Sequence, residues 1–504
     1  MRCSIFRPVT CSIATWLLVA TVAGAGVVRA AAAEVVDAGL LDAIRAVDAG
    51  GVRAALDRGA DATAAEPDGT TPLHWAVHAD DAGIVELLLA AGADAASTNR
   101  YGVAPIALAC VNGNAAVVRL LLDAGVDPNT TLAEGETALM TAARTGAQDV
   151  VELLLDYGAD VNAAEAWRGQ TALMWAAAEG HAHLVPTMLS HGADVSARSA
   201  QGWTPLLFAV REGEIGVVQT LLEAGVGAGE SLPVAQGRRR GGTSAEREAT
   251  GLDAFLLAAA NAHYELGALL VDRGADVNVA SRGWTALHQV SWVRKAGIAG
   301  SNNPSPKGSG AMTSLEFVKK IAAAGADLNA RVTIRPPAGI TRLNFIGGTP
   351  FLLAARTGDA PLMRLLAELG ADPLLPNEDG TTPIMVAAGV GTSSPGEDPG
   401  TPPEVLEAVQ VALELGGDLN EVDAKGETVM HGAAYKHVPA VVAFLAEAGV
   451  DPAVWNQPNS REWTPLDIVE NVPLGRGIQD NPATAAAIRA VMERAGVAPA
   501  ASAP

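Results

Sequence analysis

Histidines and cysteines are among the side chains that most often bind a metal ion or act in catalysis. His181-Ala182-His183 is the closest pair of histidines, and the cysteines are Cys3, Cys11 and Cys110. The sequence contains no Gly-x-Ser-x-Gly, no His-Glu-x-x-His, no phosphate-binding loop ending in Gly-Lys-Ser/Thr and no Cys-x-x-Cys-His. We therefore predict that the protein is not an enzyme and has no catalytic residue, no cofactor and no metal site.

Length and charge narrow the fold class and the class of partner. The chain has 504 residues and a net charge of −22. A single core stops growing near about 250–300 residues, so the length indicates several domains or one elongated repeat array. So acidic a protein is repelled by phosphate backbones, and we predict no nucleic-acid partner. The simplest reading of the acidity is solubility.

The first 33 residues have the anatomy of an export signal. Arg2 and Arg7 precede an apolar run, Ile13–Val28, and small residues follow it. The run is shorter than the about 20 residues that a spanning helix needs. We predict cleavage after Ala33, or after Ala30, and a periplasmic or secreted protein without membrane insertion. An uncleaved anchor is the alternative.

A repeated sequence pattern follows the first 33 residues. It predicts the helices and turns on which the remaining side chains lie. One unit opens with Thr71-Pro72-Leu73-His74-Trp75-Ala76, continues with Ile84-Val85-Glu86-Leu87-Leu88-Leu89 and closes with Ala91-Gly92-Ala93-Asp94. Thirty-three residues after Thr71 the pattern returns at Ala104, and it opens again at Thr137, Thr171 and Thr204. Self-similarity at a fixed period is the signature of a stacked array.

Each unit predicts two short helices and a turn. Thr71 can cap a helix with its hydroxyl, and Pro72 suits the first helical turn because it has no N–H to leave unpaired. The apolar residues from Ile84 to Leu89 predict a second helix. Gly92 stands where a left-handed residue ends that helix. Two helices of this size cannot bury their faces alone, so neighbouring units must supply the core.

The Thr-Pro-Leu-His start and the spacing resemble the ankyrin repeat family. The resemblance covers nearly all of residues 37–497 and implies an all-α solenoid of paired antiparallel helices, joined by β-hairpin-like turns, with about twelve repeats. It also implies that His74, His288 and His431 hydrogen-bond between repeats, and that His181 begins a helix. Cys110, at a position that other units fill with Ala or Val, is then predicted to be a small core residue.

The pattern divides the chain into segments. We predict a signal peptide at 1–33, an N-terminal capping repeat at 34–69, regular repeats at 70–226, an insertion at 227–250, repeats at 251–463, a C-terminal capping repeat at 464–497 and a disordered tail at 498–504. Insertions at 296–311, 331–348 and 389–403 interrupt the later repeats. The segment 331–348 includes Ile340, Leu343 and Phe345, so it is too apolar for a free linker. It is expected to pack on the solenoid or to meet a partner.

The resemblance implies a concave groove, lined by the turns and first helices, that grips partners. Tryptophans recur just before the opening Thr or its equivalent, and Trp is enriched at binding hot spots. The alternative is that each indole only covers the neighbouring turn. The residues predicted to contact a partner are Trp203, Trp284, Trp463, Arg144, Tyr157, His191, Arg211, Arg356, Tyr435 and Phe345.

These observations favour an exported scaffold that binds proteins through its groove. An alternative is a structural or protective role, or an inhibitor-like partner of an envelope enzyme, without a dedicated groove site. An enzyme hidden in the C-terminal insertions is a third hypothesis. The predicted partner is a protein, and the chain is predicted to be monomeric. Fold alone does not fix function.

Overall fold

The structure is a computed structural model, and it describes residues 36–132, 134–233, 251–295, 305–335, 341–393, 395, 399–472 and 481–498. These residues form helices, with three isolated β-bridges and no strand among them. The predicted all-α repeat fold is confirmed. The predicted signal peptide and all but the first residue of the predicted tail lie outside the described residues, as do 234–250 of the first insertion, 296–304, 336–340 and most of 394–398.

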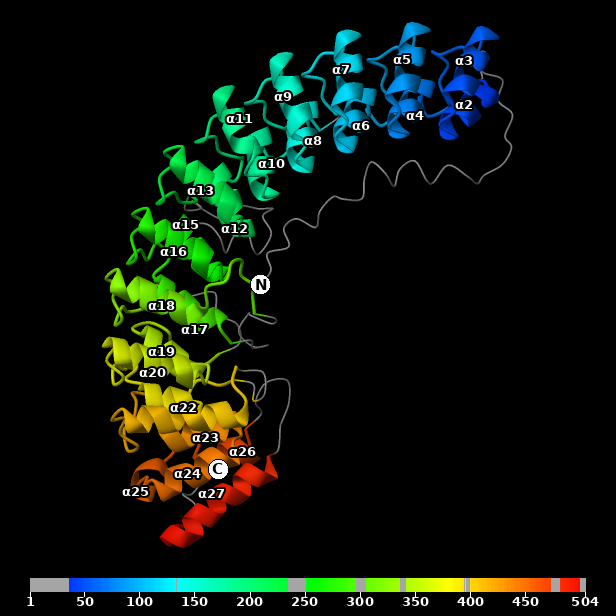
Figure 1. Ribbon diagram of the computed structural model, residues 1–504. Coiled ribbons are helices and arrows are strands. Elements are labelled where there is room, and N and C mark those ends of the chain that lie inside the picture. Colours follow the sequence, from blue (N-terminus) through cyan, green and yellow to red (C-terminus); the bar gives the residue numbers. More distant parts are fainter. Residues whose placement is uncertain are drawn as a thin grey trace. The chain divides into compact units, whose positions relative to one another are not determined.

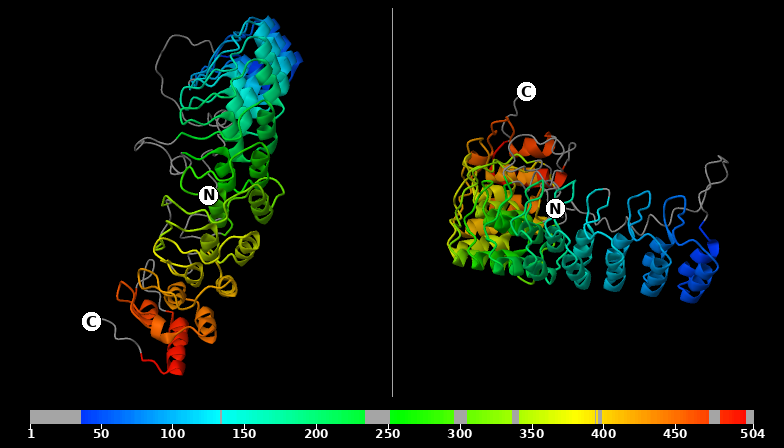
Figure 2. Two further views of the ribbon diagram at one scale, coloured as in Figure 1. Left: turned by 90° about the vertical axis from the view of Figure 1, so that its left-hand side faces the viewer. Right: turned by 90° about the horizontal axis from the view of Figure 1, so that it is seen from above.

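The chain divides into two compact units, Ser4–Gly227 and Ala228–Pro504, which we call the N-terminal and C-terminal units. Each consists of stacked helix pairs (Figure 1). The turns between pairs project from one side of the helices (Figure 2). Helix pairs are described on both sides of the boundary, but the count of about twelve repeats remains a prediction.

The N-terminal unit holds pairs in which a first helix is followed by a second. The first helices are α2 (Ala38–Arg45), α4 (Pro72–His78), α6 (Pro105–Asn112), α8 (Ala138–Thr145), α10 (Ala172–Ala178) and α12 (Pro205–Glu212). The second helices are α3 (Ala49–Asp57), α5 (Ala82–Ala90), α7 (Ala115–Asp123), α9 (Gln148–Asp156), α11 (Leu184–Ser190) and α13 (Ile215–Glu223). First helices contact the neighbouring first helices, and second helices the neighbouring second helices.

The Thr-Pro-Leu-His start caps its helix as the sequence predicts. The hydroxyl of Thr71 accepts a hydrogen bond from the His74 amide, and the Thr71 amide donates to Nδ1 of His74, which forms a capping box. Nε2 of His74 lies 3.0 Å from the carbonyl oxygen of Val103 in the next repeat. His288 and His431 make the same bridges, and burial lowers the pKa of each to about 4. These histidines therefore hold adjacent repeats together.

The core lies between the two layers of helices. Leu73, Ile84 and Leu88 are fully buried, and the corresponding residues of neighbouring repeats continue the row. Cys110 is fully buried as well, and burial raises the pKa of its thiol to about 12. The prediction that it is a core residue is confirmed. Because each repeat contacts only its neighbours, stability is close to a sum of repeats and interfaces.

The C-terminal unit keeps the pairs and adds insertions. Its first helices are α15 (Ala254–Ala260), α17 (Ala286–Val293), α19 (Pro350–Arg356), α21 (Pro383–Ala388), α23 (Val429–Lys436) and α26 (Pro465–Glu470). Their second helices are α16 (Tyr264–Asp272), α18 (Ser314–Ala323), α20 (Ala360–Leu369), α22 (Pro402–Glu414), α24 (Pro439–Glu447) and α27 (Pro482–Ala495), and the short helix α25 (Pro452–Trp455) follows α24.

The described part of insertion 331–348 packs on its own unit. Val332, Leu343 and Phe345 share a buried cluster with Trp284 and residues of α19 and α21. Of the two alternatives left open by the sequence, packing on the solenoid is thus observed. Ile334, in contrast, is 56% exposed.

Candidate partner-binding surface

The first helices and the turns that precede them form one side of each unit, which we call the first-helix face. Backbone hydrogen bonds join neighbouring turns: the Arg100 amide donates to the Asp68 carbonyl, and the Ala200 amide to the Arg168 carbonyl. These hydrogen bonds hold the joined turns at a fixed spacing. Most of the sequence-predicted site residues lie on this face, in three groups.

The first group is in the N-terminal unit. The guanidinium of Arg211 lies 4.9 Å from the ring centre of Trp203 and 5.1 Å from that of Phe208. Both Trp203 and Arg211 are largely buried, with 5% and 7% of their surface exposed. Trp203 therefore covers its own helix and turn, and a partner could contact only the edge of this stack.

Arg144 and Trp75 are more open. Arg144 on α8 lies 3.6 Å from a carboxylate oxygen of Glu136, to which the Thr141 hydroxyl also donates. The guanidinium of Arg45 lies 4.6 Å from the ring centre of Trp75 on α4, and the Trp75 indole N–H donates to Glu66. Each is half-buried, so part of the side chain faces solvent.

Tyr157 and His191 require a correction. Both lie at the carboxyl ends of second helices, α9 and α11, rather than on the first-helix face. The Tyr157 hydroxyl donates to Asp123 of α7, and His191 lies 3.7 Å from Asp156. They do not lie beside the other predicted partner-binding residues, because the residue before each closing glycine belongs to the layer of second helices.

The second group is in the C-terminal unit. Trp284 and Trp292 meet edge to face at 5.5 Å, and Phe345 lies 6.0 Å from Trp284 and 5.6 Å from Trp292. Arg356 covers Trp292 and Phe345. Trp284, Phe345 and Arg356 are 4%, 0% and 7% exposed, so the insertion itself now covers this part of the face.

The third group joins Tyr435 and Trp463. The guanidinium of Arg342 lies 5.7 Å from the ring centre of Tyr435 and 5.3 Å from that of Trp463. The Tyr435 hydroxyl donates to Glu427 at 3.0 Å, and Asn459 donates to both Glu427 and Tyr435. Tyr435 is buried and Trp463 is half-buried.

Comparison with known families then identifies the array. The family model described as "Ankyrin repeats (3 copies)" matches residues 40–132, 84–165 and 163–230. Residues 40–230 belong to the ankyrin repeat family. No curated protein matches the chain. Ankyrin repeats are generally protein–protein interaction modules, and ankyrin repeat proteins are typically non-enzymatic scaffolds.

The most exposed aromatic residues of the ankyrin turns were missed by the sequence reasoning. Trp167 is 69% exposed and Tyr101 is 42% exposed, each at the tip of a turn. Arg168 stacks on Trp167 at 4.2 Å, and Arg100 on Tyr101 at 4.8 Å. The signal was present, since Tyr101 and Arg168 directly precede the tip glycines at the repeat period. The prediction covered the residues next to the opening Thr and did not include the turn tips.

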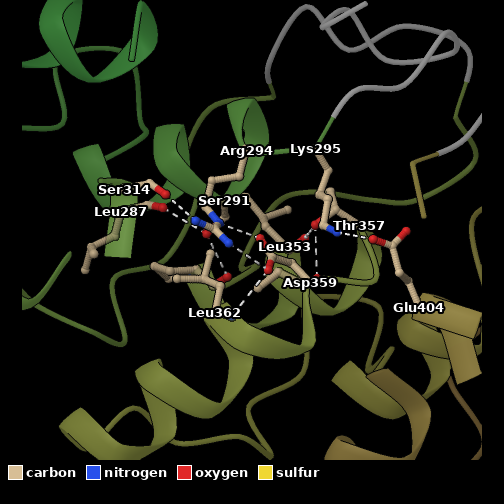
Figure 3. Close-up of polar contacts among 12 residues, drawn as sticks. Leu287, Ser291, Arg294, Lys295, Ser314, Leu353, Thr357, Asp359, Leu362 and Glu404 are labelled. Carbon is tan, nitrogen blue, oxygen red and sulfur yellow. Dashed lines mark hydrogen bonds and ion pairs between the residues drawn. The ribbon is translucent and has the colours of Figure 1, made fainter. Parts of the chain in front are cut away.

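A charged network lies inside the C-terminal unit (Figure 3). Arg294, at the end of α17, binds Asp359 through Nε at 2.6 Å and Nη2 at 3.1 Å, and also contacts Ser314. Lys295 pairs with Glu404 of α22. Asp359 also accepts from the amide of Leu362 and thereby caps α20. These side chains satisfy one another, so the network connects neighbouring helix pairs of the C-terminal unit.

The described part of the chain shows neither a metal-binding cluster nor a membrane-spanning helix. No group of three His, Cys, Asp or Glu side chains that could hold a metal ion occurs there. His181 and His183 bind the carbonyl oxygens of Arg144 and Gly146 in the preceding repeat instead. None of the described helices is long and apolar enough to cross a membrane.

Replacing Glu427 by glutamine tests the electrostatics of the third group. Burial, together with Asp423, raises the pKa of Glu427 from 4.5 to about 7. Its contribution to stability is therefore fully present below about pH 4.5 and is lost as the pH rises through 7. Glu427→Gln should stabilise the C-terminal unit by about 2–3 kcal/mol at pH 8 and by much less at pH 5.

Urea denaturation of both proteins at each pH measures this difference. His288 and His431 shift stability the other way, since their lowered pKa values remove stability as the pH falls. Comparison of variant and wild type at one pH cancels that contribution. Equal stability differences at pH 5 and pH 8 would contradict the raised pKa.

Proposed function

We propose that this ankyrin repeat protein is an exported scaffold that binds a folded protein partner through the first-helix face of its N-terminal unit. The observation that carries the proposal is the exposure of Trp167, 69%, at a turn tip with Arg168 stacked on it. A second stack, Tyr101 with Arg100, stands two turns away. Trp, Tyr and Arg are the residues most enriched at interface hot spots.

Packing within the repeats does not explain why aromatic side chains stand at these turn tips. Trp203 and Trp284 are buried against their own repeats, whereas Trp167 leaves most of its surface in water. The stacked guanidinium holds each ring in place, so less side-chain entropy is lost on binding. Backbone hydrogen bonds also hold the Trp167 turn to the turns on either side of it, from the Ala166 amide to the Glu134 carbonyl and from the Ala200 amide to the Arg168 carbonyl. A rigid row of aromatic and arginine side chains suits a folded partner better than a flexible one.

Half-buried residues extend the surface from the tips onto the helices. Arg144 and Trp75 lie on first helices, next to Glu136 and Glu66. A partner would meet both arginines and carboxylates there, so charge pairing would determine its orientation. Export is part of the proposal and rests on the sequence of residues 1–33. The bound protein would then be another exported protein.

Trp167→Ala with Arg168→Ala tests the surface. The wild-type chain, recovered from the exported fraction with a mature amino terminus at Glu34, should capture one partner in a pull-down. The double variant should weaken that binding about thirtyfold or more, because a truncated hot spot costs about 2 kcal/mol or more. The affinity is measured by titration with the captured partner.

Leu374→Ala is the matched control. Leu374 is 47% exposed and follows a second helix, away from the turn tips. Its replacement should leave the affinity unchanged. Equal affinities of wild type and the Trp167/Arg168 variant would refute the proposed surface, and retention of the chain in the cytoplasm would refute export.

A further inference from the structure

Residues 341–346 cross the first-helix face of the C-terminal unit instead of packing within one repeat. Phe345 inserts its ring between Trp284, Trp292 and Arg356, on the repeats of α17 and α19. It has no exposed surface. This end of the segment is therefore held by an aromatic pocket with a guanidinium on one side.

The middle of the segment meets α21 and the turn before it. Leu343 is 3% exposed and packs in the cluster with Val386. A Cβ at Gly391 would lie 2.6 Å from that of Leu343, so the glycine makes room for it. The side-chain amide of Asn344 donates to Asp379, and Asn377 donates to the Asn344 carbonyl.

The other end reaches the third group. The Arg342 amide donates to the Gly391 carbonyl at 2.9 Å, and its guanidinium covers Tyr435 and Trp463. Four consecutive residues, 342–345, thus contact successive repeats from α17 to the turn before α26. Each side chain meets its own set of groups, as in the recognition of an extended peptide.

The fit at the arginine end is incomplete. Oε2 of Glu427 and Nη1 of Arg342 are both buried, and neither has a hydrogen-bond partner among the described residues. A buried polar atom without a partner costs free energy. The Glu427 carboxylate lies beside the same Tyr435 ring that Arg342 covers. An arginine placed deeper on this ring would gain an ion pair that Arg342 does not make.

We propose that the first-helix face of the C-terminal unit recognises an extended peptide in which an arginine precedes a phenylalanine by three positions, with an aliphatic residue next to the arginine. Residues 342–345 of the chain occupy this site as an intramolecular ligand. A partner segment of the same pattern binds in their place. The proposal concerns a different unit from the proposed function, and either can fail without the other.

The test uses the full chain and a fluorescent peptide with the sequence of residues 341–347. A variant carrying Arg342→Ala, Leu343→Ala and Phe345→Ala empties the site, and Ile334→Ala, in the same insertion but exposed, is the control. Fluorescence anisotropy should show binding to the emptied variant that is at least about tenfold tighter than to wild type or the control, because the intramolecular ligand competes. Alanine in place of the peptide's phenylalanine or arginine should weaken binding about tenfold.

Each other outcome overturns the proposal. A folded emptied variant that does not bind the peptide would show that the face does not recognise this pattern. Equal binding to wild type and the emptied variant would show that residues 342–345 do not occupy the peptide's site. Loss of the helical circular dichroism signal in the variant would show that the segment is a core element and not a ligand. The Trp167/Arg168 variant should bind the peptide as wild type does, which separates this site from the proposed function.

Discussion

Replacing Arg294 by alanine is expected to destabilise the C-terminal unit by about 3–5 kcal/mol, the loss found when one partner of a buried ion pair is removed. Asp359 is fully buried, and Arg294 holds both of its carboxylate oxygens. Without the guanidinium the carboxylate would stay buried with the Leu362 amide of α20 as its remaining hydrogen-bond donor among those described. The end of α17, Ser314 of α18 and the N-cap of α20 would then lose the side chain that connects them (Figure 3).

Urea denaturation and hydrogen exchange of the amides in α17, α18 and α20 measure the loss. A repeat array need not unfold in one step, so exchange localises the effect. Arg364→Ala is the control, because its pair with Glu414 is exposed at both ends and should contribute less than about 1 kcal/mol. If Arg294→Ala changes stability no more than Arg364→Ala, the network does not hold these repeats together.

Replacing Phe317 by alanine should cost about 3–5 kcal/mol, as for other large buried aromatics. Phe317 of α18 is fully buried and lies 6.0 Å from Phe255 and 5.3 Å from Tyr264. Its ring stands against Gly267 of α16, where a Cβ would lie 2.9 Å from a ring carbon. The glycine therefore makes space for the ring, and removal of the ring leaves a cavity.

A second substitution makes this test specific. Gly267→Ala should destabilise the wild type, because the methyl group meets the ring. In the Phe317→Ala background the same methyl group enters the cavity and alanine favours the helix by about 1 kcal/mol, so the change should become stabilising. Denaturation of the four proteins gives the interaction energy. Additive effects would show that Phe317 and Gly267 do not share this space.

The sequence predicts the repeat fold well, because the pattern is local. Thr71, Pro72 and His74 act within one helix turn, and their roles follow from capping chemistry. The insertion at 331–348 is different. Its apolar residues indicate that it packs on something, but the contacts of Phe345 with Trp284 and Trp292 depend on where a non-periodic segment crosses neighbouring repeats. No spacing rule describes such a path.

The candidate surface was predicted only in part. Placing Trp203 beside the opening Thr correctly brings it to Arg211, but the period does not say how much of each ring remains exposed. That depends on the size of the neighbouring repeat's side chains. Trp167 remains exposed because it lies at a turn tip, beyond the reach of the helices.

Site-specific cross-linking shows directly whether a protein partner binds the first-helix face of the N-terminal unit. Photoreactive residues replace Tyr101 and Glu134 at exposed turn tips, and in separate variants Glu86 and Arg119 on exposed positions of second helices. With the captured partner bound, we expect cross-links from positions 101 and 134 and none from 86 and 119. Cross-links from the second helices alone would contradict it.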